Sequence, residues 1–93
     1  MVINKKKLKE LEELAAVFFT VENIALVLLV DPEELKRELK KKSSSVYKHY
    51  WRGRLRADFV VRKSIVELAS RGSSQAQDSV MKLSKQLVIH ETT

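Results

Sequence analysis

The sequence predicts an all-α fold of five helices, with a three-helix N-terminal unit over residues 1–43 and a long antiparallel helical hairpin over residues 44–93. Two glycines and one proline in 93 residues are too few for a turn-rich β architecture. Apolar residues recur at steps of three and four along most of the chain, which is typical of amphipathic helices. Capping residues stand between these periodic segments and predict where each helix begins.

The first helix is expected from about Asn4 to Phe18 or Phe19, and the second from Val21 to about Leu29. The first has one apolar face, formed by Leu8, Leu11, Leu14, Ala15 and Phe18. Thr20 stands between the two helices, and its hydroxyl can accept a backbone N–H at the start of the second. The second helix is apolar on nearly every side, so we expect neighbouring helices to surround it.

A third helix should follow from Pro32 to about Lys42. Asp31 supplies an acidic N-cap, Pro32 occupies the first helical position, and glutamates follow in the first turn. Leu35 and Leu39 then face inward. The opposite face carries Glu33, Arg37, Lys40 and Lys41.

A long helix is predicted from Val46 to Arg71, capped by Ser44 or Ser45. Its expected apolar side consists of Tyr47, Trp51, Leu55, Phe59, Ile65, Val66 and Ala69. A basic stripe on another side consists of Lys48, Arg52, Arg56 and Lys63. Gly53 lies inside this helix, where it predicts a kink or a close helix contact.

Gly72 is expected to end the long helix in the left-handed conformation, and Ser74 with Gln77 to form a capping box for the last helix. Because the connection is so short, the two helices should run antiparallel. We expect the hairpin to join copies of the chain into a homo-oligomer. The side chains expected at that contact are Leu55, Phe59, Val66, Val80, Leu83 and Leu87.

The net charge of +6 is concentrated in one stretch of the chain. Residues 36–63 hold eleven basic and two acidic residues, a local charge of +9, whereas the rest of the chain carries −3. Such a concentration is typical of a surface that binds a polyanion. A charged helix face that only interacts with solvent would usually mix acidic and basic residues along its length.

Residues 20–42 resemble a helix-turn-helix, in which Ala25 allows close helix approach and Val30 with Leu35 fixes the crossing. The third helix would then enter the major groove of double-stranded DNA. Glycine is absent near Leu29, where such units commonly have it, and an acid such as Glu33 must accept a hydrogen bond from cytosine to be favourable. The predicted DNA-binding residues are Thr20, Glu33, Arg37, Lys40, Lys41, Lys48, Arg52 and Arg56.

Other chemistries are poorly supported. The chain has no cysteine, His49 and His90 lack companion ligands, and two isolated glycines cannot build a phosphate loop. We therefore expect no metal, no cofactor and no enzymatic activity. The longest apolar run, residues 24–30, is far shorter than the roughly 20 residues that span a bilayer. Acidic residues interrupt the N-terminal region where a signal peptide would be continuously apolar. We expect a cytoplasmic protein with no membrane partner.

Three stretches resemble phage terminase small subunits, the DNA-recognition components of genome-packaging motors. They are the helix-turn-helix from Phe19 to Leu35, the segment from Val46 to Gly53, similar to a Tyr-x-x-Tyr-x-x-Gly pattern, and the segment from Ile65 to Ser74, similar to a Leu-Ala-x-x-Gly helix end. The resemblance implies that the N-terminal helices contact DNA and that the hairpin assembles a ring. It also implies a C-terminal contact with the motor, hence a large terminase subunit as partner, and the host cell cytoplasm as location.

Three alternatives stay open at this stage. The chain is also compatible with a small helix-turn-helix transcriptional regulator, which would bind as a dimer on a palindrome. A helical protein-interaction module could instead use the basic face to bind an acidic partner. Single-stranded nucleic acid could stack on Tyr50 and Trp51, although Tyr47 and Trp51 are expected in the core.

Overall fold

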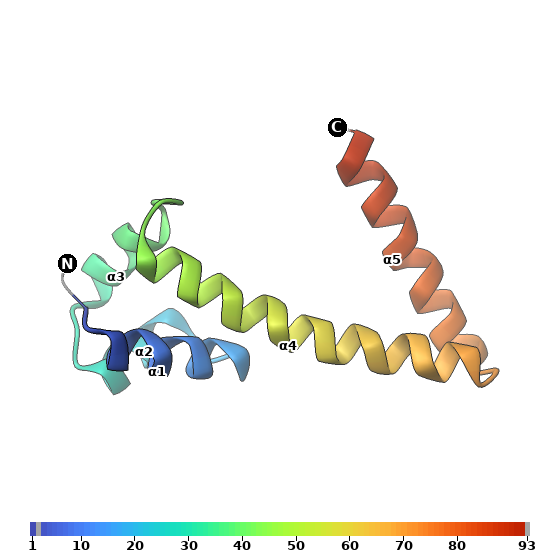
Figure 1. The fold of residues 1–93 in the computed structure, drawn as a ribbon, viewed down its shortest axis with the longest axis horizontal. Helices are drawn as coiled ribbons and strands as arrows, with labels where there is room; N and C mark the ends of the chain where they lie inside the picture. Colours follow the sequence, from blue (N-terminus) through green and yellow to red (C-terminus); the bar gives the residue numbers. More distant parts are fainter. Residues whose placement is uncertain (2, 93) are drawn as a thin grey trace. The chain divides into compact units, whose positions relative to one another are not determined.

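The computed structural model describes the backbone of residues 1 and 3–92 and the side chains of residues 1 and 3–87. Within those residues the fold is all-helical with no strand, as predicted. Five helices follow one another along the chain (Figure 1): α1 (Lys5–Ala16), α2 (Val21–Leu28), α3 (Pro32–Leu39), α4 (Ser45–Ser70) and α5 (Ser74–Thr92).

Side-chain caps explain where the helices begin. The Lys7 amide donates to Asn4 Oδ1 at 2.8 Å, the Asn23 amide to Thr20 Oγ1 at 3.2 Å, and the Glu33 amide to Asp31 Oδ1 at 3.2 Å. These bonds satisfy amides that have no partner inside the helix. The predicted starts of the second and third helices are therefore confirmed, as is Ser44 as the cap of α4, where its Oγ accepts the Val46 amide at 3.1 Å.

The cap of α5 differs from the prediction. Ser73, and not Ser74, accepts the Ala76 amide at 3.2 Å. Because α5 begins at Ser74 itself, one residue earlier than a Ser74 cap requires, Gln77 has no capping-box role, and its Nε2 donates to the carbonyl oxygen of Ala69 at 3.1 Å. Gly72 does adopt the left-handed conformation expected of it, with φ at +99°.

One hydrophobic core joins the first four helices. Its buried members are Leu8, Leu11, Ala15, Ile24, Ala25, Leu28, Leu35, Val46 and Tyr50. Leu35 is fully buried and Leu39 packs against the core, as expected for the inner face of α3. Val30 also packs against this core, in the connection between α2 and α3.

Contacts divide the chain into two units, Met1–Asp58 and the residues from Phe59 onward. The boundary lies inside α4 and not at residues 43/44. The reason is that the first turns of α4 belong to the N-terminal core, where Val46, Tyr50 and Gly53 are buried.

Gly53 lies where α4 closely approaches α1. A Cβ placed on Gly53 would overlap the carbonyl oxygen of Glu12 and lie 3.3 Å from the Cβ of Ala15. The two helices run side by side in Figure 1, and only a residue without a side chain fits between them at this point. The close helix contact expected at Gly53 is thus confirmed.

The apolar side predicted for the long helix was wrong in its first turns. Val46, Tyr50 and Gly53 face the core, whereas Trp51 is 41% exposed and Tyr47 is half-buried. Helical periodicity predicts that the face with the largest apolar side chains is buried. In this helix the close contact with α1 instead buries the neighbouring face, which carries Gly53.

Candidate nucleic-acid interface

α2 and α3 form the pair of helices in which the sequence predicted a helix-turn-helix. Ala25 is fully buried in α2, and residues 29–31 connect it to α3. Leu29 ends α2 in the left-handed conformation, with φ at +57°, and its side chain is 84% exposed. Leucine therefore stands where glycine would be free of steric cost, since a Cβ disfavours this conformation by about 1–2 kcal/mol.

An ion pair between Glu22 and Lys36 joins α2 to α3. Lys36 Nζ lies 2.9 Å from Glu22 Oε1 and 3.7 Å from Glu33 Oε1. The hydrogen bond to Glu22 raises the pKa of Lys36, and the same bond lowers the pKa of Glu22. Lys36 is thus the member of the basic stretch whose charge is most closely balanced by the protein itself.

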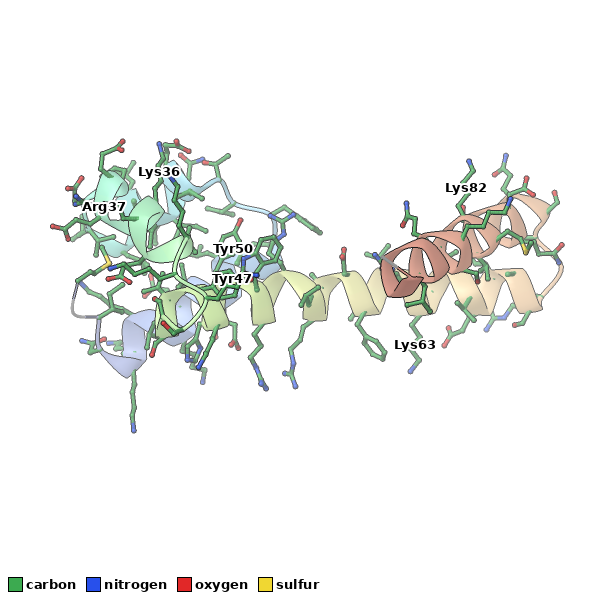
Figure 2. All side chains as sticks on the ribbon, turned by 90° about the horizontal axis from the view of Figure 1, so that it is seen from above. Lys36, Arg37, Tyr47, Tyr50, Lys63 and Lys82 are labelled. Atoms are coloured by element: carbon green, nitrogen blue, oxygen red, sulfur yellow. The ribbon has the colours of Figure 1, made fainter. Side chains whose placement is uncertain are left out.

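The outer face of α3 separates acidic from basic residues along the helix. Glu33 and Glu34 lie in the first turn, and Arg37 and Lys40 are exposed at the other end (Figure 2 labels Lys36 and Arg37). Acids at the N-terminus and bases near the C-terminus both stabilise the helix dipole. As a consequence, the cations on this face gather toward its C-terminal half.

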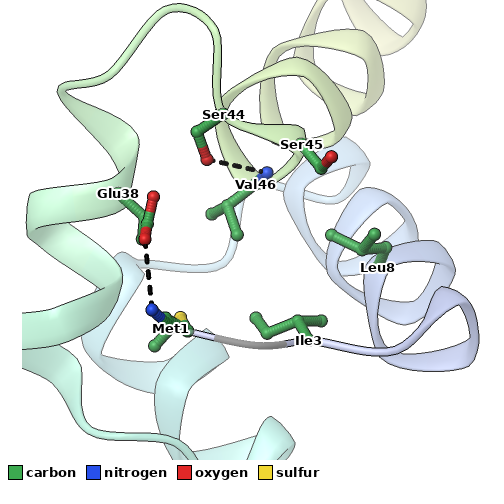
Figure 3. A pocket seen from close by; sticks show the side chains of 7 residues that line it. All are labelled: Met1, Ile3, Leu8, Glu38, Ser44, Ser45 and Val46. Carbon is green, nitrogen blue, oxygen red and sulfur yellow. Dashed lines mark hydrogen bonds and ion pairs between the residues drawn. The ribbon is translucent and has the colours of Figure 1, made fainter.

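Glu38 lies under the connection between α3 and α4 (Figure 3). Its Oε1 is 3.4 Å from the N-terminal ammonium and 3.8 Å from Lys41 Nζ, and the side chain is 15% exposed. Burial acts to raise the pKa of Glu38, but hydrogen bonding to Ser44 and the two cations outweigh it, so the pKa is lowered. Glu38 therefore stays ionised and balances part of the Lys41 charge.

The start of α4 carries the second group of predicted contacts, Lys48, Arg52 and Arg56, all exposed. Glu12 of α1 lies 3.4 Å from Arg52 Nε and 3.2 Å from His49 Nδ1. The contact between Arg52 and Glu12 therefore links the basic stripe of α4 to α1. Lys63, the fourth member of the predicted stripe, belongs to the second unit, where its Nζ lies 6.0 Å from the Phe59 ring centroid.

The remaining predicted site residues have different environments. The Thr20 hydroxyl already accepts the Asn23 amide, so it is a helix cap. Of the residues predicted for self-association, some are exposed in the single chain and others are half-buried. Leu55, Phe59, Val66 and Leu87 are 50–63% exposed, and Val80 and Leu83 are half-buried.

Periodicity did not reveal the role of Arg54. Its guanidinium lies 5.2 Å from the Phe18 ring centroid and 6.0 Å from that of Tyr50, and Nη1 donates to Tyr50 Oη at 3.2 Å. The i to i+4 spacing of Tyr50 and Arg54 is the only sign of this in the sequence. Arg54 is thus a structural link between α4 and the end of α1.

Among the described residues, no group of three or more His, Cys, Asp or Glu side chains is placed to hold a metal ion, and the side chain of His90 lies outside them. No helix in that part of the chain is both long enough and apolar enough to cross a membrane. Comparisons with protein-family models, with curated proteins and with solved structures found no match to this chain.

Proposed function

We propose that this chain is a non-enzymatic protein that binds double-stranded DNA through the outer face of α3 and the first turns of α4. The observation that carries the proposal is a set of exposed cations that make no ion pair with the described residues: Arg37, Lys40, Lys48 and Arg56. Cations of this kind neutralise phosphates and release their counterions, which supplies much of the free energy of DNA binding.

The charge separation along α3 supports one orientation on the duplex. The C-terminal half, with Arg37 and Lys40, contacts phosphates, and Lys41 and Lys42 extend the basic surface into the connection to α4. The acidic first turn lies where no phosphate approaches. Glu33 is acceptable at a base edge only as an acceptor from cytosine N4.

The biological role we propose is that of a phage terminase small subunit, on the resemblance of the three sequence stretches described above. In this role the chain recognises DNA for genome packaging in the host cytoplasm, with a large terminase subunit as partner. The exposed apolar side chains of the second unit support self-association, because each is about half exposed and burying the rest of it would stabilise a contact between copies by about 1–2 kcal/mol.

A pair of matched charge reversals tests the DNA surface. The double variant Arg37→Glu/Lys40→Glu should weaken binding to a labelled duplex by more than tenfold at 100 mM salt. The control Lys5→Glu/Lys9→Glu changes the net charge equally on exposed positions of α1 and should leave binding within about threefold. Circular dichroism checks that both remain folded. Equal loss in both variants would show that net charge alone drives binding and would refute the assignment to α3.

A second candidate function is protein interaction through α2. Leu26 and Leu29 are 73% and 84% exposed and line a hollow of about 480 Å³ together with Pro32. Neighbouring exposed leucines are characteristic of surfaces that bind proteins. If this is the main function, Leu26→Ser should abolish the capture of a protein partner, and duplex DNA should not displace that partner.

A further inference from the structure

Trp51 is the largest aromatic side chain that the N-terminal unit leaves exposed on α4. Its neighbours Val46, Tyr50 and Gly53 face the core, so the indole points to another side of the helix and is 41% exposed. A ligand that covers an exposed indole gains the free energy of burying that ring.

Two tyrosines hold the indole in place. The Tyr50 ring packs edge-on to it with centroids 5.4 Å apart, and the Tyr47 ring lies tilted at 6.3 Å (Figure 2 labels both tyrosines). Tyr50 is itself buried and is fixed by Arg54. A partner that stacks on Trp51 therefore meets a ring that is already positioned, and the entropic cost of ordering it is small.

Two cations of α4 are close to Trp51 in the chain. Lys48 and Arg52 lie within one turn of Trp51 and, with His49, line a shallow hollow of about 270 Å³. Lys48 makes no ion pair with any residue that the structure describes, and the Arg52 side chain is 56% exposed although Glu12 contacts its Nε. An aromatic face beside one unpaired cation and one exposed guanidinium complements a base and its phosphate.

We propose that Trp51 is a stacking site for an unpaired base of single-stranded nucleic acid, whose adjoining phosphates are neutralised by Lys48 and Arg52. This contact shares Lys48 with the proposed duplex surface, but it does not involve the cations of α3. It would allow the chain to engage a strand that has been opened or left unpaired next to a duplex. The shared chemistry is the unpaired base, in DNA or in RNA.

Intrinsic fluorescence tests the proposal directly because Trp51 is the only tryptophan. Titration of the full chain with a 20-nucleotide oligo-dT, and separately with oligo-U, should quench the emission at low salt. Quenching by either strand supports stacking and identifies DNA or RNA as the preferred source. Absence of quenching by both strands would overturn the proposal.

Anisotropy of a labelled strand separates stacking from a structural role. Trp51→Leu should weaken single-strand binding by about 5- to 150-fold, the effect of losing one stacked base, and Trp51→Phe should restore most of it. Both variants should bind duplex DNA as the wild type does. Equal loss of duplex and single-strand binding, or no loss in Trp51→Leu, would refute the proposal. Arg37→Glu/Lys40→Glu should leave the quenching intact, so failure of the α3 surface is distinguishable.

Discussion

At the scale of single residues, two positions determine the local geometry of the N-terminal unit in opposite ways. Gly53 is matched to its site, because any side chain would overlap the Glu12 carbonyl. Leu29 is poorly matched to its site, because it adopts a left-handed backbone conformation. That conformation is unfavourable in free energy for any residue that has a Cβ. Substitutions at Gly53 and Leu29 should therefore change the free energy of unfolding in opposite directions.

Gly53→Ala should destabilise the fold by about 1–2 kcal/mol. Because the overlap is with a backbone atom of α1, it costs about 2–3 kcal/mol, in the upper part of the range for overpacking, and the better helix propensity of alanine returns about 1 kcal/mol. Chemical denaturation measures the difference. Ser64→Ala, at an exposed position of the same helix, is the control and should be neutral or slightly stabilising. A Gly53→Ala variant as stable as the wild type would contradict the close contact.

Leu29→Gly should stabilise the fold by about 1 kcal/mol, since glycine adopts a positive φ without steric cost and little buried surface is lost at this exposed position. Leu26→Gly is the matched control. It changes another exposed leucine, in a helical position, and should destabilise by about 0.5–1 kcal/mol. Equal losses of stability in Leu29→Gly and Leu26→Gly would contradict the backbone strain at Leu29.

At the scale of the helices, the sequence predicted much of what the structure contains. Caps and the proline at the start of α3 identified helix boundaries because these effects act within one turn of chain. The buried face of α4 was predicted wrongly, since Tyr50 and not Trp51 faces the core. That choice depends on how closely α1 and α4 approach, and the approach is set by Gly53 and Ala15 from two distant segments.

The same limit applies to the candidate interface. A helical wheel identified Arg37 and Lys40 as exposed, because periodicity determines which face of a helix is outward. It did not reveal that Lys36 is balanced by Glu22 of α2, or that Arg52 contacts Glu12 of α1. Such pairings join residues that are neighbours only after folding.

The Glu22–Lys36 pair predicts how stability responds to pH. The pKa of Glu22 is lowered from 4.5, so its contribution is present above that value and is lost as the pH falls through the lowered pKa. The pKa of Lys36 is raised from 10.5, so its contribution is lost only as the pH rises through the raised value. Glu22→Gln should lower the melting temperature slightly at pH 7, and the difference should shrink as the pH falls below 4.5 through the lowered pKa of Glu22. A constant difference across this range would contradict the pair.

At the scale of the whole molecule, the exposed apolar side chains of the second unit predict an assembly of several copies. Native mass spectrometry should give multiples of 10.7 kDa. Leu87→Lys places a charge on an exposed apolar position of α5 and should dissociate the assembly, while Lys85→Ala should not. A ring of many copies would favour a packaging role, and a dimer would favour a regulator. A monomer at all concentrations would refute self-association.

The central claim, that the concentrated cations bind duplex DNA, is tested most directly by the salt dependence of affinity. If about six phosphates are neutralised, the affinity of the full chain for a duplex should fall about 10³-fold between 50 and 200 mM salt. Arg37→Glu/Lys40→Glu should make the slope of log affinity against log salt shallower by about two. Binding that does not change with salt, or no binding to duplex DNA at 50 mM salt, would contradict the account.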